Sequence, residues 1–341
     1  MELSFIVPVY NVEEYIRDCM ESIFHQGLDD NCFEVIIIND GSTDNSIETI
    51  KDFIHSHKNV TLINQNNQGL SVARNNGIAL AKGEYILMTD SDDLLMEYSI
   101  KLLLEKAIET KADMVIADFI RMSDEEIENI KINPPKQPPF EIYEKTEKQQ
   151  IIKDLYPLEC YVWRTLFRRK FILDNNITFY PGIYFQDIPF THECYIKANK
   201  TLVVSRLLSI YRRGHDTAAS SPNSFTTKKA KDLSIAIAKT WELIHIKDLS
   251  PIITKRIQTN TYVLFMNFCY RILHFLKSYQ EASDTLIYLN QHSPDLHFGN
   301  NIFHKICNIM RYKKPYIYLT CLSTWWGIRR LFRVKENGIP E

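Results

Sequence analysis

The chain of 341 residues is 45 % hydrophobic, which supplies enough apolar side chains for one large domain or two modest ones and excludes wholesale disorder. Its 40 basic and 42 acidic side chains nearly balance, so the net charge of -2 argues against the strongly basic surface of a nucleic-acid-binding protein. The seven cysteines are scattered and form no Cys-x-x-Cys pair, which favours reduced thiols in a cytosolic protein over a zinc site or a disulfide framework.

Strand and helix patterns alternate through the first 120 residues. Asn11 is predicted to cap the first helix, with Glu14 as its capping-box partner, and Gly27 is predicted to end it. Continuous apolar runs predict strands at Leu3–Val9, Phe33–Ile38, Val60–Ile63, Tyr85–Met88 and Asp113–Phe119, and helical spacing predicts helices from Thr43 or Asp44 to Ile54, at Ser71–Ala81 and at Ile100–Ile108. Apolar strands that alternate with helices indicate an α/β fold whose parallel sheet is covered on both faces.

The pattern changes after residue 120. The segment Arg121–Gln150 is rich in Glu, Lys and Pro, which predicts a loop or an insertion. From Lys228 onward the chain is helical and poor in glycine, and it contains no further strand–turn–helix unit. We therefore predict a first domain of residues 1–225 and a helical C-terminal region of residues 226–341.

Three aspartates follow the apolar run Tyr85–Met88, namely Asp90, Asp92 and Asp93. In an open α/β sheet, ligands bind beyond the carboxyl ends of the strands. Carboxylates gathered there repel one another unless they share a cation, and Mg²⁺ or Mn²⁺ is usually held by one or two carboxylates together with substrate phosphates. The cluster predicts a metal–phosphate site. Turn formation and helix capping are the alternatives, and capping fits Asp93 because Leu94-Leu95 follows it.

Other strand ends also carry polar residues. Asp40-Gly41 follows the second strand, where an aspartate is well placed to bind a base or a ribose, although the pair is also a turn signal. The chain has no G-x-G-x-x-G after its first strand and no G-x-x-x-x-G-K-[ST] motif, which argues against NAD-dependent enzymes and P-loop proteins. Nucleotide phosphates would need a bound metal and Arg or Lys side chains instead.

In their order and spacing, these motifs resemble glycosyltransferase family 2. The resemblance extends over residues 1–215, and it is the combination that is specific, because each motif alone is weak. It is carried by Val7-Pro8-Val9-Tyr10-Asn11, Asn39–Asp44, Asn67–Gly77, Thr89–Asp93, Trp163–Ile172 and Phe179–Phe190. It implies the GT-A fold, with a mostly parallel sheet flanked by helices. It also implies a nucleotide-binding half in residues 1–120 and an acceptor and catalytic half in residues 151–215.

The same resemblance implies the residues that hold the donor. Asp40 matches the family's base-recognising aspartate, which contacts uracil in members that use uridine diphosphate. Pro8, Tyr10 and Glu14 would lie near the nucleotide. Arg74 matches the arginine that helps to hold the nucleotide side of the donor.

Metal and catalytic residues are implied in the same way. Asp90-Ser91-Asp92 matches the family's Asp-x-Asp motif, in which Asp92 would ligate Mn²⁺ or Mg²⁺, Asp90 would face the ribose or support the metal, and Ser91 would lie against the nucleotide sugar. His215 is a further candidate metal ligand, although a lone histidine is more often structural. Asp187 matches the catalytic base, and its apolar neighbours are expected to raise its pKa. The alternative for Asp187 is a cap on the helix that follows.

Some positions depart from the family pattern. Gln186 stands where the family has Glu before the base, which leaves the role of a second acid open. Arg164 and Thr165 replace the usual Asn and Lys after the tryptophan, and these changes bear on the acceptor more than on the nucleotide. Arg212 and Arg213 resemble a family segment near the diphosphate.

The C-terminal tail combines basic and aromatic side chains over residues 305–335, and Arg311 is among them. If Ser323–Val334 is helical, Trp325 and Phe332 share one face and arginines lie beside it. Such a helix suits an anionic membrane interface, so residues 305–335 predict peripheral attachment to the inner face of the cytoplasmic membrane. The alternative is a terminal helix packed on its own domain. We expect no signal peptide, and the longest charge-free stretches are shorter than the ~20 residues that span a bilayer.

We therefore predict an inverting, metal-dependent hexosyltransferase in the cytoplasm. It would move a sugar from a nucleotide-diphosphate sugar, expected to be a UDP-sugar, to a hydroxyl of a glycan or lipid-linked acceptor in cell-surface polysaccharide synthesis. One alternative is a sugar-1-phosphate nucleotidyltransferase, but that class usually has a basic Gly-rich loop that Val9–Glu14 lacks. The other is a non-catalytic module that binds nucleotide sugars.

Overall fold

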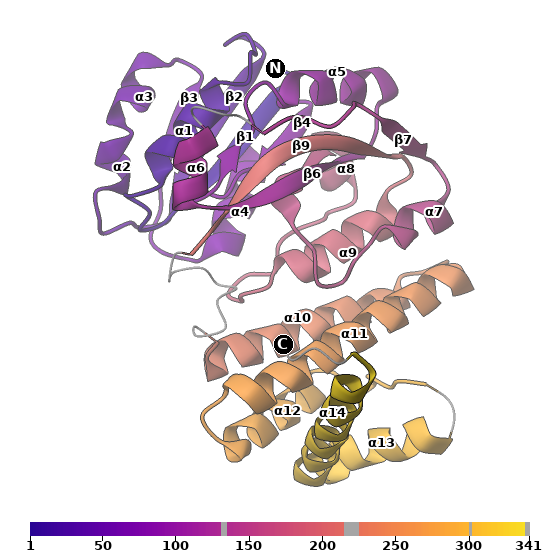
Figure 1. Cartoon of the computed structure of the whole chain (residues 1–341). Coiled ribbons are helices and arrows are strands. Elements are labelled where there is room, and N and C mark those ends of the chain that lie inside the picture. Colours follow the sequence, from indigo (N-terminus) through magenta and orange to yellow (C-terminus); the bar gives the residue numbers. More distant parts are fainter. Residues whose placement is uncertain (131–134, 215–224, 300–301, 338–341) are drawn as a thin grey trace. The chain divides into compact units, whose positions relative to one another are not determined.

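The computed structural model describes residues 1–130, 135–214, 225–299 and 302–337. The chain divides into two compact units, residues 1–216 and 217–341 (Figure 1). Strands and helices alternate in the first unit, and the second is helical in its described part. The helical C-terminal region is confirmed, while the domain boundary after residue 225 stays a prediction.

One mixed sheet forms the centre of the first unit. Its strands are β1 (Leu3–Val9), β2 (Phe33–Asn39), β3 (Val60–Asn64), β4 (Tyr85–Met88), β5 (Leu94–Leu95), β6 (Met114–Ser123), β7 (Ile142–Lys145), β8 (Thr165–Arg168) and β9 (Thr201–Arg213). In the described part of the chain they lie in the order β3-β2-β1-β4-β8-β6-β9-β5, and β7 pairs with β9. Strands β3, β2, β1 and β4 are parallel, as predicted. Beyond them β8 is antiparallel to both β4 and β6, so the rest of the sheet is mixed.

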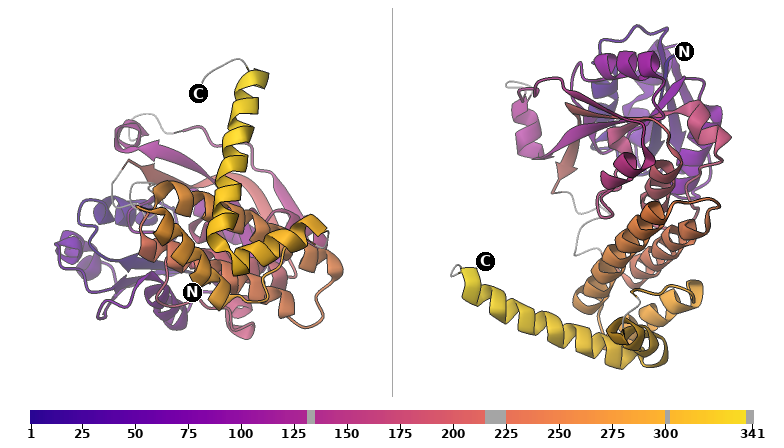
Figure 2. Two further views of the ribbon diagram at one scale, coloured as in Figure 1. Left: turned by 90° about the horizontal axis from the view of Figure 1, so that it is seen from below. Right: turned by 90° about the vertical axis from the view of Figure 1, so that its right-hand side faces the viewer.

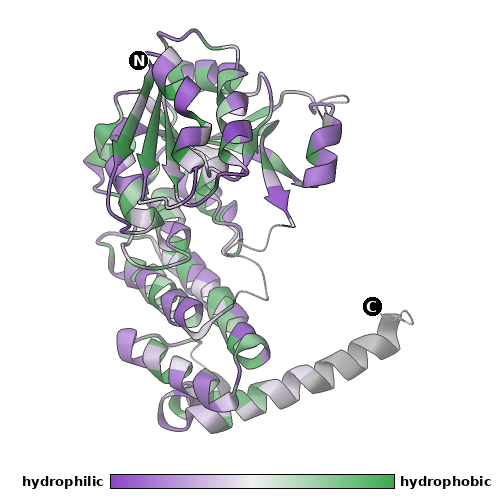
Figure 3. Cartoon of the chain, turned by 90° about the vertical axis from the view of Figure 1, so that its left-hand side faces the viewer, coloured by the Kyte–Doolittle hydropathy of each residue, from purple (hydrophilic) through white to green (hydrophobic). Residues whose placement is uncertain are grey.

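Helices cover both faces of this sheet because its central strands are apolar on both sides (Figure 3). Phe5 and Val7 share a core with residues of α1 and α5. On the opposite face Ile6 meets Gly77 of α4, where a Cβ atom would lie 2.3 Å from Cγ2 of Ile6, so only glycine permits this approach. The helices of the unit are α1 (Ile16–Phe24), α2 (Ser46–Thr49), α3 (Lys51–Ser56), α4 (Leu70–Leu80), α5 (Ile100–Thr110), α6 (Asp124–Ile130), α7 (Lys148–Lys153), α8 (Arg169–Asp174) and α9 (Asp187–Lys197).

Strands β1 and β4 separate at Pro8, near the carboxyl edge of the sheet. Their pairing ends where the Thr89 N–H donates to the Ile6 carbonyl (2.9 Å), whereas the pairing of β1 with β2 continues to Val9. In a central strand, the backbone groups of successive residues point in turn to the strand on one side and to the strand on the other. Pro8 therefore stands where the next N–H directed at β4 would be needed, and proline has no N–H. The strand order also changes direction between β1 and β4, and such points are where α/β sheets bind ligands.

Two helix-cap predictions are wrong, and a segment predicted as a loop or an insertion contains regular elements. Asn11 does not cap α1; its φ is 51° and α1 begins only at Ile16. Asp93 does not cap a helix either, because Leu94–Leu95 forms strand β5 and Ser99 holds the N-cap position of α5. The predicted loop after residue 120 instead contains the end of β6, helix α6, strand β7 and the start of α7.

The second unit is built from helices in its described part (Figure 2). They pack around aromatic and aliphatic side chains. Its helices are α10 (Thr227–Glu242), α11 (Pro251–Phe275), α12 (Tyr279–His292), α13 (Ile302–Lys313) and α14 (Pro315–Asn337). Helix α10 packs on α11 and α12, and α14 packs on α12 and α13. Helix α14 includes residues 323–334, so the condition on which the membrane prediction depends is met. Within the described ranges, no helix combines the length and the apolar character needed to cross a membrane.

Candidate active site at the carboxyl edge of the sheet

The loops after β1 and β2 are cross-linked by short polar side chains. Asn11 Oδ1 accepts a hydrogen bond from the Thr43 N–H (2.8 Å), and Asp44 Oδ2 accepts one from the Glu13 N–H (3.0 Å). Tyr10, which is 49 % exposed, therefore stands on a fixed loop. Of the other residues predicted near the nucleotide, Glu14 is exposed on the same loop and Pro8 is buried in β1. Sequence reasoning missed the cross-links, because each joins residues about 30 positions apart.

Asp40 is buried and fixes the loop that leads into α4. Its Oδ1 accepts hydrogen bonds from Gln65 Nε2 (2.7 Å) and the Gln68 N–H (2.8 Å), and its Oδ2 accepts one from the Gly69 N–H (2.8 Å). A carboxylate has about four acceptor positions, so roughly one remains for a ligand. The predicted base contact stays a prediction, and the structure adds a second role for Asp40 as the anchor of this loop.

Arg74 connects the acidic strand end to a segment a hundred residues later. Its side chain is 3 % exposed and forms an ion pair with Asp90. The same guanidinium lies 5.3 Å from the ring centre of Phe179. The side chain of the neighbouring Asn75 forms two hydrogen bonds with the backbone of Phe179. Its Nδ2 donates to the Phe179 carbonyl (2.8 Å), and its Oδ1 accepts from the Phe179 N–H (2.9 Å). In turn, Phe179 stacks on Phe190 of α9 with ring centres 3.8 Å apart, and α4 thereby positions the start of α9.

Asp187 is the first residue of α9 and lies within electrostatic reach of both Arg74 and Asp90. Burial raises the pKa of Asp187 to about 6; Asp90 adds to this rise, and Arg74 opposes it. Backbone N–H groups at the helix start also favour its ionised form. Gln186, not Asp187, occupies the N-cap position, so the capping alternative is wrong. The structure therefore brings together three predicted site residues that lie far apart in the sequence.

The acidic turn after β4, residues Asp90–Asp93, is closed by a hydrogen bond from the Asp93 N–H to the Asp90 carbonyl (3.1 Å). Asp93 is buried, and its Oδ1 accepts the Arg212 N–H (2.9 Å), while its Oδ2 has no hydrogen-bond partner among the described residues. Burial, together with the charges of Asp92 and Asp90, raises the pKa of Asp93 well above its usual range. Turn formation and carboxylate clustering are thus both present, and Ser91 is buried inside the turn.

Arg212 of β9 holds this acidic turn in place. Its Nε donates to the Asp92 carbonyl (3.0 Å), and its Nη2 pairs with Asp18 of α1 (2.9 Å). Asp124 of α6 is a third partner, and the guanidinium lies 4.9 Å from the ring centre of Tyr15. The resemblance had placed Arg212 near the diphosphate, but its guanidinium is already paired with protein groups.

Carboxylate oxygens suit a hard divalent cation. Two features fit a site that a cation would stabilise: Asp93 Oδ2 has no partner in the described part of the chain, and the charges of Asp90, Asp92 and Asp93 repel one another. Within the described ranges, no three His, Cys, Asp or Glu side chains gather closely enough to hold a metal. The candidate ligand His215 lies outside the described residues. Asp92 and Asp90 remain the candidate ligands.

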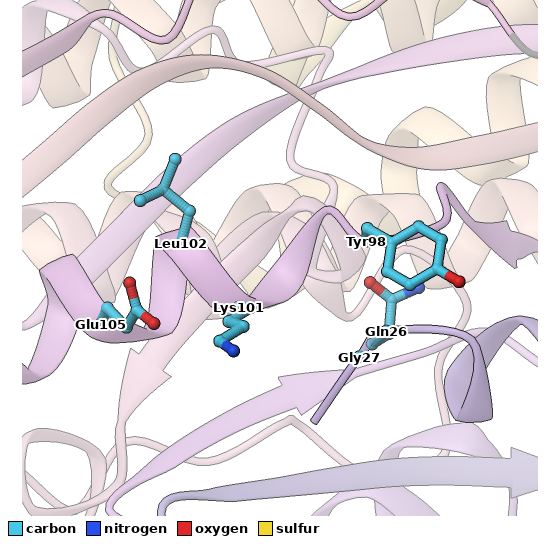
Figure 4. A pocket seen from close by; sticks show the side chains of 6 residues that line it. All are labelled: Gln26, Gly27, Tyr98, Lys101, Leu102 and Glu105. Atoms are coloured by element: carbon cyan, nitrogen blue, oxygen red, sulfur yellow. The ribbon is translucent and has the colours of Figure 1, made fainter. Parts of the chain in front are cut away.

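A separate pocket lies over the C-terminal end of α1 and the first turns of α5 (Figure 4). It is lined by Gln26, Gly27, Tyr98, Lys101, Leu102 and Glu105. The side-chain amide of Gln26 forms hydrogen bonds with backbone groups. It donates to the Met96 carbonyl (2.9 Å) and accepts from the Ile100 N–H (3.1 Å). None of the predicted site residues lines this pocket, and we assign it no catalytic role.

Known proteins resemble this chain in sequence. Residues 4–173 match a family model described as glycosyl transferase family 2. EpsJ of Bacillus subtilis, described as an uncharacterized glycosyltransferase, is 34 % identical over 227 residues, which are 66 % of this chain and 62 % of EpsJ. The chain thus covers less than two thirds of that relative's length.

Solved structures share the fold. The chain is similar to residues 1–349 of S. aureus TarS in complex with UDP, with a TM-score of 0.67 at 18 % identity over 95 % of this chain and 92 % of TarS 1–349. It is also similar to the mannosyltransferase PcManGT of Pyrobaculum calidifontis in complex with GDP-Man and Mn²⁺, with a TM-score of 0.56 at 14 % identity over 95 % and 86 % of the two chains. The predicted GT-A fold with C-terminal helices is confirmed. The chain belongs to glycosyltransferase family 2.

Proposed function

We propose that this protein is an inverting, metal-dependent hexosyltransferase. It would transfer a sugar from a UDP-sugar to a hydroxyl of a glycan or lipid-linked acceptor in cell-surface polysaccharide synthesis. The observation that carries the proposal is the convergence of Arg74, Asp90 and Asp187 at the carboxyl edge of the sheet. The UDP named with TarS supports the choice of donor.

On the donor side, the fixed loops after β1 and β2 would bind the nucleotide. The exposed ring of Tyr10 offers a stacking surface, and Glu14 lies on the same loop. Asp40 would contact the base through its remaining acceptor position while it holds the loop before α4. Pro8 contributes by parting β1 from β4 beside the acidic turn.

Asp92, supported by Asp90, would hold Mn²⁺ or Mg²⁺, and Mn²⁺ is the ion named with PcManGT. Such an ion neutralises the charge that develops on the departing diphosphate. Arg74 keeps the Asp90 carboxylate in place and adds a positive charge to the same edge of the sheet. His215 stays a candidate ligand.

Asp187 would act as the general base. The acceptor oxygen forms its bond to the anomeric carbon as the bond from that carbon to the diphosphate breaks, and the hydroxyl proton passes to Asp187. In-line displacement inverts the anomeric centre. A pKa of about 6 leaves Asp187 mostly ionised at pH 7 and basic enough to accept a proton.

A transfer assay with a panel of nucleotide sugars, with and without Mn²⁺, tests the proposal. Asp187→Asn should lower transfer by about 10²- to 10⁴-fold while UDP still raises the unfolding temperature. The matched control is Asp174→Asn, because Asp174 is an exposed helical aspartate paired only with Lys170 among the described residues. Transfer by Asp187→Asn at the wild-type rate would contradict the base assignment.

The same assay separates the alternatives. A sugar-1-phosphate nucleotidyltransferase would release pyrophosphate from a nucleoside triphosphate and a sugar 1-phosphate. A binding module would bind UDP-sugar and release neither sugar nor pyrophosphate.

Peripheral attachment to the cytoplasmic face of the membrane through residues 305–335 is part of the proposal. Its support is the basic and aromatic composition of the tail and the helix α14, on which Trp325 is exposed. Flotation with anionic liposomes, with and without residues 305–341, tests it. Equal recovery of both forms in the soluble fraction would rule out attachment by the tail.

A further inference from the structure

A cluster of aromatic rings with two arginines lies on the face of β6 and β9 and is not used in the reaction above. Phe119 pairs with Ser209 and Arg121 pairs with Tyr211 in the parallel register of these strands. Side chains two apart on a strand point to the same face, so Phe119, Arg121 and Tyr211 lie together. The 3-10 turn Val162–Arg164 and the residue before it add Tyr161, Trp163 and Arg164. We call these six residues the aromatic platform.

The rings of the aromatic platform contact one another in a fixed arrangement. Trp163 is nearly parallel to Tyr211, with centres 5.8 Å apart and planes 5° apart. Tyr161 stacks on Trp163 at 5.0 Å, and Phe119 meets Trp163 edge-on at 4.9 Å. Trp163 is buried beneath the others, whereas Phe119, Tyr161 and Tyr211 each keep part of their surface exposed. Rings with only two side-chain torsions, already packed on a buried tryptophan, lose little freedom when a ligand binds.

The two arginines differ in how they are held. Arg164 donates from Nε to the Ala117 carbonyl (2.8 Å) and has Asp118 at 3.6 Å. Arg121 is exposed, lies 4.8 Å from the ring centre of Phe119 and donates weakly to the Tyr161 hydroxyl (3.4 Å). Within the described ranges, Arg121 has no carboxylate partner. Its charge is therefore available beside the exposed rings.

Two residues of the aromatic platform are chain neighbours of residues that lie near the candidate site. Tyr211 immediately precedes Arg212, whose N–H holds Asp93 of the acidic turn. Tyr161 immediately follows Cys160, whose buried thiol lies within electrostatic reach of Asp187. The donor loops belong instead to β1, β2 and α4, so a ligand on these rings would approach Asp187 from the other half of the unit.

We propose that the aromatic platform binds an anionic acceptor: a sugar or polyol chain lies with its C–H groups on the exposed rings of Phe119, Tyr161 and Tyr211, and its phosphate or carboxylate pairs with Arg121. Ring faces are negative and attract the weakly positive C–H groups of a sugar face. The planar guanidinium matches a phosphate or a carboxylate through two parallel hydrogen bonds. The proposal rests on the proposed function, because it assigns the acceptor of the same site.

Direct binding, measured by tryptophan fluorescence without any donor, tests this inference separately from catalysis. The probes are a glycerol-phosphate pentamer, a tetragalacturonate and neutral maltotetraose. We expect the full chain to bind at least one anionic probe at least tenfold more tightly than maltotetraose. Which anionic probe binds distinguishes a phosphodiester acceptor from an acidic sugar.

Arg121→Gln should weaken that binding at least tenfold and leave the UDP-induced rise in unfolding temperature unchanged. Arg206→Gln, on the neighbouring strand β9 and outside the aromatic platform, is the matched control and should bind like the wild type. Tyr211→Leu should weaken all three probes, and its unfolding temperature shows whether the fold survives. If the wild type prefers no anionic probe, or if Arg121→Gln binds it as the wild type does, the inference is overturned. Either result leaves the proposed function intact, since transfer is assayed separately.

Discussion

The two units of the chain each bury an arginine, and they stabilise its charge differently. In the first unit, Arg212 is 5 % exposed, and its guanidinium pairs with the carboxylates of Asp18 and Asp124. Its Nε donates to the Asp92 carbonyl (3.0 Å). Four elements, α1, the acidic turn, α6 and β9, therefore meet at one side chain.

In the helical unit, Arg311 of α13 is 1 % exposed and has no carboxylate partner within the described ranges. Its guanidinium donates to the Leu296 carbonyl, and its Nε and Nη1 have no hydrogen-bond partner there. Three rings surround it, with centres 4.4 to 5.6 Å away, from Tyr312, Phe265 and Phe298. Burial accordingly lowers the pKa of Arg311.

The Arg212 charge holds the residues of the candidate site in place, whereas the Arg311 charge is buried among aromatic rings and holds none of the described site residues. Removing one member of a buried ion pair leaves the others uncompensated, whereas replacing a poorly paired buried charge by an apolar side chain of similar size is often neutral or stabilising. Variants at both arginines, and at the charges near Arg212, therefore test whether the first unit alone depends on its charge network.

The largest effect is expected from Arg212→Met. The change leaves Asp18 and Asp124 without their cation and the Asp92 carbonyl without a donor, so unfolding free energy should fall by about 3 kcal/mol. Transfer should also be lost, because Asp92 loses its fixed position. Urea unfolding followed by far-UV circular dichroism, together with the transfer assay, measures both. The control is Arg213→Met, an exposed arginine of the same strand, which should cost less than about 1 kcal/mol.

Arg74→Gln addresses the charges around the proposed base. Only ionised Asp187 can accept the proton, so transfer by the wild type should fall as the pH drops below about 6, by about tenfold per pH unit. Because Arg74 lowers the pKa of Asp187, its removal should move this limb of the pH–rate profile to higher pH. A profile of kcat/KM between pH 5 and 8 measures the shift. An unmoved limb would mean that the titrating group is not Asp187.

Asp187→Asn should stabilise the protein even as it lowers transfer. The folded-state pKa of Asp187 is raised, so its contribution to stability is full below about pH 4 and is lost as the pH rises through about 6. At pH 7 the wild type therefore carries a penalty that asparagine removes, and unfolding free energy should rise by about 2 to 3 kcal/mol. Urea unfolding of both proteins at pH 7 and pH 4 measures this, and the gain should vanish at the lower pH.

The sequence predicted what depends on local pattern. Strands β1 to β4 were placed within one residue because buried strands are continuous apolar runs, and Asp90 and Arg74 were found through motifs that the structure brings together. Asn11 and Asp93 were misassigned as helix caps because capping and long-range acceptance both need a short polar side chain. Their partners are the N–H groups of Thr43 and Arg212, which lie 32 and 119 positions away in the sequence. No local pattern marks such pairs.

The C-terminal tail shows the same limit. Arg311 was grouped with the basic residues of the tail, for which solvent or a membrane surface was expected, yet it is among the most buried side chains of the second unit. Its neighbours Phe265 and Phe298 come from α11 and from the segment after α12, and neither is close in sequence. Helical periodicity places a residue on one side of its helix, but does not identify which helices cover that side.

The smallest effect is expected from Arg311→Met, and it bears most directly on the comparison. Methionine keeps much of the volume among the three rings and removes a charge that has no carboxylate partner in the described part of the chain. The Leu296 carbonyl loses one donor, Arg311, and keeps the Tyr312 hydroxyl (3.1 Å). The lost hydrogen bond offsets part of the gain, so unfolding free energy should change by less than about 1 kcal/mol. Transfer and the pH–rate profile should match the wild type. A loss of about 3 kcal/mol, equal to that of Arg212→Met, would show that the three rings around Arg311 stabilise a buried cation as well as two carboxylates do.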